Sequence, residues 1–167
     1  MYTAQLGHHF HAAHRLPHID GKCRNLHGHT WHAAITLAAP TLNSDGMLVE
    51  FSAFKNVMRA WIDAHLDHGA MLGTDDPLAR VLQAKGSRVF VFGEDHSPDR
   101  WPTVESVAGL LAQRAAEWLA AADPRSDAYI ARVDVAETPS NSASWVNPAL
   151  IYTGSSAWSH AIPAAAR

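Results

Sequence analysis

The chain has 167 residues, enough to bury a core without disulfides, and its formal net charge is −3 with neutral histidines. Because it has no Lys/Arg cluster and a single cysteine, its composition argues against a nucleic-acid surface and a disulfide scaffold, and favours a reducing cytoplasm. The N-terminal segment MYTAQLGHHF does not resemble a signal peptide, and no apolar run is long enough to span a membrane. We therefore expect a single cytoplasmic domain over residues 1–167. Its unusual feature is twelve histidines, since histidine is a frequent metal ligand.

The first third of the chain predicts two strands, over residues 4–14 and 27–37. His14 shares the parity of the apolar residues of the first strand, and His27 and His29 share the parity of Trp31 in the second. Side chains of one parity point to one face of a sheet. The loop between them, RLPHIDGKCRN, contains the proline and glycine that interrupt pairing.

Helical spacing of apolar residues predicts helices over residues 51–66 and 103–124. Thr103 is expected to cap the second helix, and Pro124 to end it. We expect a short strand over residues 87–92, a polar loop over 93–102, and a final hairpin over 128–137 and 143–152. Strands separate from two helices indicate an α+β fold. The sequence lacks βαβ alternation with a glycine-rich fingerprint, which argues against a Rossmann fold.

Histidine spacing predicts a metal site. His27 and His29 are two residues apart on one strand face, and His14 on the preceding strand can supply a third imidazole. Three imidazoles leave one position of a Zn²⁺ ion open, as in catalytic zinc sites. Ordinary surface or core histidines remain the alternative, and five further histidines are rival ligands: His8, His9, His11, His18 and His32.

Cys23 lies four residues before His27, between Lys22 and Arg24. The two cations and a nearby metal would favour its thiolate, which is the reactive form. We expect a free thiolate that acts as a general base. Two alternatives stay open: a fourth zinc ligand in a closed structural site, or an inert small apolar side chain.

Two acidic positions are candidates for proton transfer and ligand binding. Asp67 directly precedes His68, and a carboxylate that orients an imidazole is a common proton relay, although a solvated helix end fits as well. Glu137 shares the parity of Val135 and would face the apolar side, where it needs hydrogen-bond donors such as the paired N–H groups of a ring. The alternative is a strand that ends at Ala136 and leaves Glu137 in water.

Six segments in this order resemble the 6-pyruvoyltetrahydropterin synthase / 6-carboxytetrahydropterin synthase family over roughly residues 4–145: FHAAHRLP, KCRNLHGH, DGMLVEFSAFK, LDH, PTVES and AETPS. The resemblance implies a T-fold, a four-stranded antiparallel sheet with two helices packed on one face. It also implies an oligomeric β-barrel, a homohexamer with sites between subunits. The segments over residues 69–101 and 153–167 are additions to this pattern.

The resemblance carries the family's functional residues onto matching positions. It implies zinc ligands at His14, His27 and His29; catalytic residues at Cys23, Asp67 and His68; and pterin-binding residues at Glu137, Thr103 and Glu105. The implied substrate is 7,8-dihydroneopterin triphosphate, on which zinc acts as a Lewis acid. The short spacing C-x3-H-G-H favours the 6-carboxy product, formed with loss of triphosphate and acetaldehyde toward 7-deazapurines such as queuosine. A 6-pyruvoyl product or another pterin substrate remains the alternative.

Overall fold

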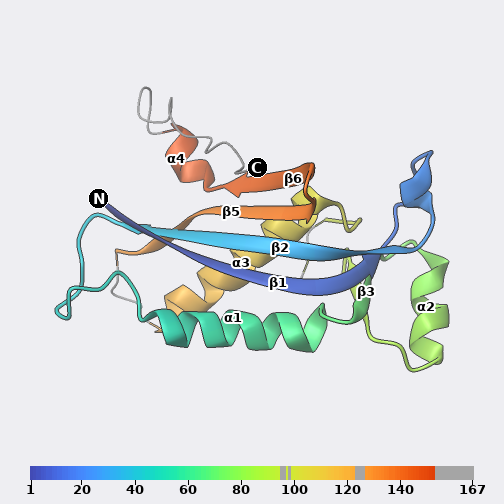
Figure 1. Ribbon diagram of the computed structural model, residues 1–167, viewed down its shortest axis with the longest axis horizontal. Helices are drawn as coiled ribbons and strands as arrows, with labels where there is room; N and C mark the ends of the chain where they lie inside the picture. The colour runs from blue at the N-terminus through green and yellow to red at the C-terminus, as the bar shows by residue number, and fades with distance from the viewer. Residues whose placement is uncertain (95–96, 98, 123–126, 153–167) are drawn as a thin grey trace.

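One curled sheet of six strands forms the centre of the computed structural model, which describes residues 1–94, 97, 99–122 and 127–152 (Figure 1). The strand order is β4-β3-β1-β2-β5-β6. Four of the strands pair in antiparallel fashion, namely β1 (Tyr2–His14), β2 (His27–Ala39), β5 (Tyr129–Thr138) and β6 (Asn141–Val146). The α+β class is confirmed, and the two strands predicted in the first third of the chain are present.

The expectation of a purely antiparallel, four-stranded sheet is wrong. Residues 69–92 form β3 (Gly69–Gly73), helix α2 (Pro77–Ala84) and β4 (Val89–Phe92), with β3 parallel to β1 and β4 parallel to β3. This is a βαβ unit, the usual way to join parallel neighbours. The short strand predicted over residues 87–92 is present as β4, whereas β3 and α2 were missed; β3 has only five residues, too few to show a period.

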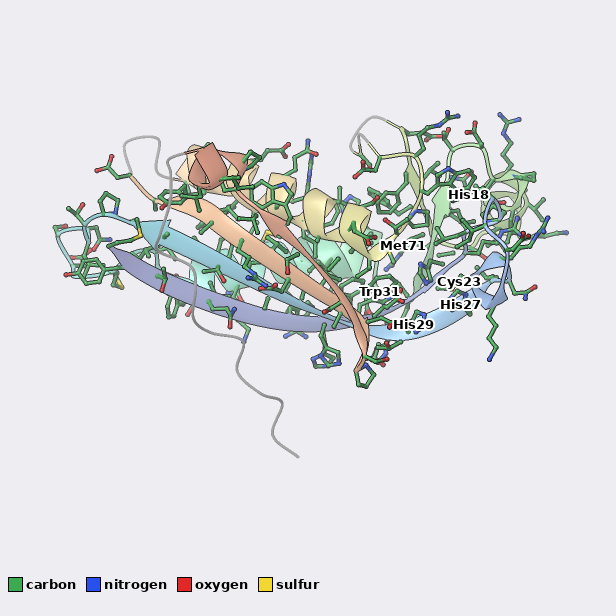
Figure 2. All side chains as sticks on the ribbon, turned by 90° about the horizontal axis from the view of Figure 1, so that it is seen from above. His18, Cys23, His27, His29, Trp31 and Met71 are labelled. Atoms are coloured by element: carbon green, nitrogen blue, oxygen red, sulfur yellow. The ribbon has the colours of Figure 1, made fainter. Side chains whose placement is uncertain are left out.

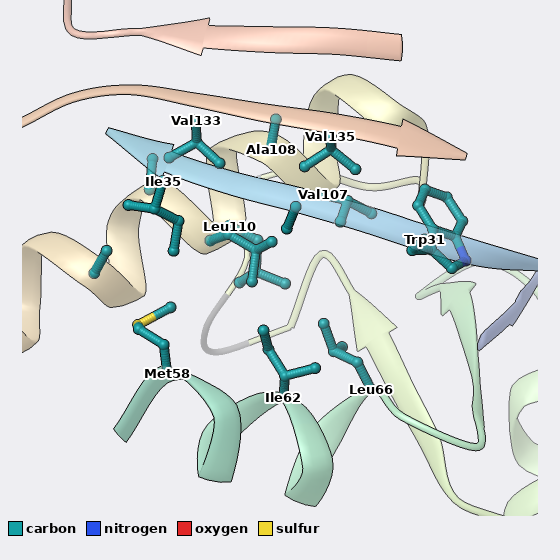
Figure 3. Close-up of a cluster of buried hydrophobic side chains, with 14 of the residues drawn as sticks. Trp31, Ile35, Met58, Ile62, Leu66, Val107, Ala108, Leu110, Val133 and Val135 are labelled. Atoms are coloured by element: carbon teal, nitrogen blue, oxygen red, sulfur yellow. The ribbon is translucent and has the colours of Figure 1, made fainter. Parts of the chain in front are cut away.

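Two helices, α1 (Phe51–His65) and α3 (Val104–Ala122), pack on one face of the sheet. Glu50 begins α1 by accepting hydrogen bonds from the amides of Ser52 and Ala53. Thr103 begins α3, as predicted, because its Oγ1 accepts a bond from the Ser106 amide at 3.2 Å. Side chains of both helices fill the space beneath β2 and β5, which leaves the opposite face of the sheet uncovered by them (Figure 3).

The predicted last strand over residues 143–152 is wrong in its second half. β6 ends at Val146, and a short helix, α4 (Pro148–Tyr152), follows. Asn147 explains the change, because its Oδ1 accepts a hydrogen bond from the Ala149 amide at 3.0 Å. Pro148 suits the first helical position, where no amide donor is needed.

Two expectations lie outside the described residues: the helix end at Pro124 and the additional tail over residues 153–167. Among the described residues, none of the helices combines the length and the apolar character that a membrane span requires.

Candidate active site

Three predicted ligands converge at one end of the β1–β2 pair. His14 lies directly opposite His27 in the strand register, and His29 follows two residues later on the same face. One ligand atom from each of the three side chains lies within 4.8 Å of the others. Figure 2 shows His27 and His29 following each other along β2, with Trp31 next toward the middle of the strand. The strand register therefore builds a three-imidazole cluster that could hold a metal ion.

The hydrogen bonds of the rings orient them for a metal ion. His14 Nδ1 is 2.8 Å from the carbonyl oxygen of Pro102, and His27 Nδ1 is 2.7 Å from that of Asn25. A carbonyl oxygen only accepts, so both Nδ1 atoms carry the proton and both Nε2 lone pairs are free. His14 Nε2 is buried and has no hydrogen-bond partner among the described residues. A buried nitrogen without a partner is costly, and a metal ion at this point would remove the cost.

Burial favours the neutral form of two of the three rings, those of His14 and His29. His14 is 1% exposed and lies edge-on to the buried Trp31, with ring centroids 4.9 Å apart. Burial lowers the pKa of His14 and of His29 from the ordinary histidine value. A neutral imidazole is the form that binds a metal, so the cluster is suited to one near neutral pH.

Glu137 lies next to the histidine cluster. Its Oε2 is 3.7 Å from His14 Nε2, and its side chain is 16% exposed. β5 continues through Thr138, with a bulge between Ala136 and Thr138, and Asn141 Nδ2 donates to Glu137 Oε1 at 3.3 Å. The structure thus places this carboxylate on the helix side of the sheet, as its parity predicts, and not at a wet strand end.

The loop that carries Cys23 leaves β1 directly after His14. Cys23 lies in a short 3-10 helix (Lys22–Arg24) and is half-buried, and its carbonyl oxygen accepts a hydrogen bond from the Leu16 amide at 2.7 Å. Cys23 and His27 lie at the same end of β2 (Figure 2). Within the described part of the chain, Cys23 is not one of the residues whose ligand atoms form the cluster.

A buried ion pair fixes the start of this loop. Arg15 Nε donates to Asp76 Oδ2 at 2.6 Å, and its Nη2 donates to the other carboxylate oxygen. Asp76 is 2% exposed and also caps α2 by accepting from the Leu78 amide. The hydrogen bonds from Arg15 hold the pKa of Asp76 below the ordinary aspartate value. A second contact joins His18 of the loop to Trp101, with ring centroids 4.3 Å apart.

Asp67 and His68 form a hydrogen-bonded pair beside β1, directly before β3 begins to pair with it. Asp67 Oδ2 lies 2.7 Å from His68 Nδ1, and Asp67 Oδ1 accepts from the His11 amide at 2.8 Å. Burial opposes ionisation of Asp67, yet these two hydrogen bonds hold its pKa below the ordinary value. His68 has a φ of 54°, a left-handed conformation uncommon outside glycine. Such strain is often found at functional sites.

The pair is not part of the three-histidine cluster. The His68 ring is 5.6 Å from that of His11, and residues 11 and 14 point to opposite faces of β1. His68 and His29 line the same open pocket, about 410 Å³ in volume, at the edge of the sheet. Within a single chain, the Asp67–His68 pair therefore lies at the edge of the candidate site and does not contact the space between the three metal-ligand candidates.

Comparison with known proteins identifies the family. The family model for 6-pyruvoyl tetrahydropterin synthase matches residues 4–148. The chain belongs to this family. A 6-carboxy-5,6,7,8-tetrahydropterin synthase of Rickettsia typhi is 42% identical over 101 residues, which cover 59% of this chain and 69% of the relative. A probable 6-carboxy-5,6,7,8-tetrahydropterin synthase of Halobacterium salinarum is 30% identical over 132 residues, covering 79% and 78%.

Solved structures share the fold, and one of them is a 6-pyruvoyl tetrahydropterin synthase. The enzyme of Caenorhabditis elegans aligns with a TM-score of 0.61 and 22% identity, over 87% of this chain and 95% of the other. An uncharacterized protein from Wolinella succinogenes aligns with a TM-score of 0.69 and 21% identity, over 87% and 98%. These neighbours support the expected α+β T-fold, although the sheet of this chain has six strands and not four.

The family's PT-x-E segment lies at the start of α3. The Thr103 hydroxyl is engaged in the helix cap, 3.1 Å from Ser106 Oγ, and Glu105 is exposed in the first turn. The segment reaches the histidine cluster through the carbonyl oxygen of Pro102. Sequence reasoning missed this contact and the Arg15–Asp76 pair. No local signal could have found them, because the partners are 88 and 61 residues apart.

Proposed function

We propose that this chain is a zinc-dependent 6-carboxy-5,6,7,8-tetrahydropterin synthase. It would convert 7,8-dihydroneopterin triphosphate to 6-carboxytetrahydropterin, with loss of triphosphate and acetaldehyde. The observation that carries the proposal is the convergence of His14, His27 and His29, together with a buried His14 Nε2 that has no hydrogen-bond partner among the described residues. The names of the relatives and the C-x3-H-G-H spacing support the 6-carboxy product.

In this proposal the three imidazoles would hold the zinc ion, with His14 and His27 bound through Nε2 because the carbonyls of Pro102 and Asn25 hold their Nδ1 atoms. Bound zinc would supply a Lewis acid that acidifies the C–H next to the substrate's side-chain hydroxyls. Imidazole ligands favour zinc over magnesium or calcium, which prefer oxygen ligands. The uncharged ligand set leaves the full charge of the ion for this purpose.

The remaining groups of the chain would move protons and bind the ring. Cys23 Sγ, as the thiolate, would take a proton from the substrate carbon, which requires a sulfur not bound to the metal. Asp67 holds the Nδ1 side of His68 and leaves its Nε2 to exchange protons with substrate or water. Glu137 would accept two N–H bonds from the pterin ring. Thr103 and Glu105 would line the substrate pocket beside it.

The ion pair between Arg15 and Asp76 fits this scheme as a positioning element. Arg15 lies one residue after His14, at the start of the loop that carries Cys23, and Asp76 belongs to the segment over residues 69–101. The ion pair therefore ties the start of the Cys23 loop to that segment. That segment would therefore act as a fixed support for the Cys23 loop. We further propose a cytoplasmic homohexamer with sites between subunits, in which a neighbouring copy brings its Asp67–His68 pair to the cluster, and a queuosine-type pathway.

The decisive experiment incubates the purified protein with 7,8-dihydroneopterin triphosphate and identifies the products by mass spectrometry. The proposal predicts triphosphate, acetaldehyde and 6-carboxytetrahydropterin, whereas a 6-pyruvoyl product without acetaldehyde would reassign the reaction. Cys23→Ala should retain zinc and lose turnover. If the wild type releases no triphosphate, the enzyme assignment fails, and if Cys23→Ala loses its zinc, the thiol is a ligand and not a base.

A further inference from the structure

The face of the sheet opposite α1 and α3 carries a second group of imidazoles that the proposed reaction does not use. His9 and His11 lie on β1 and His32 on β2, and all three are exposed. Their neighbours Phe10 and Trp31 are buried on the helix side, at 1% and 0% exposure. Strand alternation therefore points the three histidines away from α1 and α3.

The spacing of this group along the two strands repeats that of the candidate metal centre. There, His27 and His29 are two residues apart on β2, and the third ligand pairs directly with the first of them. Here His9 and His11 are two residues apart on β1, and His32 pairs directly with His9. Side chains directly opposite on neighbouring strands have Cβ atoms about 5 Å apart. The same register thus provides two three-histidine groups, one on each face.

The rings of the second group are close but not yet convergent. The His9 centroid is 6.1 Å from that of His32 and 6.2 Å from that of His11, compared with 4.6–5.3 Å within the first cluster. Exposed side chains change rotamer readily, so rotation can close this difference. His11 Nδ1 is 3.1 Å from Thr30 Oγ1, which steadies that ring and leaves its Nε2 for a ligand.

Open space lies on both sides of the group. A groove of about 450 Å³ is lined by His9 and His32 together with the small residues Gly7, Ala34 and Ala136. The pocket of about 410 Å³ described above includes His11. An ion that retains water ligands can therefore reach the rings without displacing any core side chain.

We propose that His9, His11 and His32 bind a second divalent transition-metal ion, with zinc as the ion to test. Imidazole nitrogen suits zinc, nickel and copper, and three such ligands at this register form a chelate. Because these rings are exposed and must rotate to converge, this site binds more weakly than the partly buried first cluster. The proposal rests on the geometry of the opposite face and not on the pterin chemistry, although His11 also contacts His68 of the proposed relay.

Equilibrium dialysis of the metal-free protein against buffered zinc tests this directly. The wild type is expected to bind a second, weaker zinc ion per chain, and the double variant His9→Ala/His32→Ala should lose the weaker ion alone. His65→Ala is the matched control, because His65 is an exposed histidine held against Trp61 outside the group. It should retain both ions.

Two outcomes would overturn the proposal. One is a wild type that saturates at a single zinc ion per chain. The other is a double variant that still binds the second ion while its circular dichroism and urea unfolding match those of the wild type. A His29→Ala variant separates the sites, because it should lose the tighter ion and keep the weaker one.

Discussion

Replacement of Asp76 by alanine should be among the most damaging single changes outside the metal ligands. Asp76 is 2% exposed, receives two hydrogen bonds from Arg15, and caps α2. Removing one partner of a buried pair costs about 3–5 kcal/mol, and losing a helix cap costs about 1 kcal/mol. The Arg15 side chain is 23% exposed and can regain some hydration, so we expect a total loss of about 3 kcal/mol.

Urea unfolding at one protein concentration measures this loss, which corresponds to a fall in Tm of about 6–12 °C. Asp76→Asn is the matched control, because asparagine can still cap α2 but leaves the Arg15 charge unpaired; it should lose about 2 kcal/mol. In the double variant with Arg15→Ala, the second change should add little. Fully additive losses, or an Asp76→Ala variant within about 0.5 kcal/mol of the wild type, would refute the reasoning.

The same pair predicts a pH dependence. The folded-state pKa of Asp76 is lowered, so its stabilisation is fully present above the ordinary aspartate pKa of about 3.9 and is lost as the pH falls through the lower folded-state value. The wild type should therefore lose more free energy of unfolding than Asp76→Ala when the pH falls from about 5 to 3. Parallel stability profiles for the two proteins would contradict this.

Three further substitutions test other parts of the account. Gly73→Ala should cost about 1–3 kcal/mol in urea unfolding, because a Cβ there collides with the Trp101 ring; an unchanged midpoint would contradict that packing. Glu137→Gln should raise the substrate KM about tenfold or more with zinc content unchanged, and an unchanged KM would remove Glu137 from the ring site. His68→Gly removes the proposed relay imidazole, so turnover should fall. Because glycine accepts the left-handed backbone of residue 68, stability should not fall; a loss above about 1 kcal/mol in the free energy of unfolding would show a structural role.

Local sequence patterns were sufficient to predict the elements that are long enough to show a clear period. β1 and β2 each have 13 residues, so alternation identified them and placed His14, His27 and His29 on one face. The start of α3 was also predictable, because its cap is a local contact of Thr103. These features depend on residues that are near one another in the chain.

The remaining features depend on distant partners. The strand β3 is too short to show a period, and it is stabilised by pairing with β1 and β4 and by packing of α2. The α4 helix follows a strand-like sequence and is set by the cap at Asn147. The contact of Pro102 with His14 joins residues far apart in sequence, so no pattern within a short segment encodes it.

The central claim is that three imidazoles from β1 and β2 hold one metal ion while Cys23 stays unligated. Diffraction data collected across the zinc absorption edge from crystals of the purified protein test it most directly. The account predicts a strong anomalous peak about 2.0–2.1 Å from one imidazole nitrogen of each of His14, His27 and His29, with Cys23 Sγ outside bonding distance. A peak bound to Cys23, or zinc-loaded crystals without a peak at these three histidines, would contradict it.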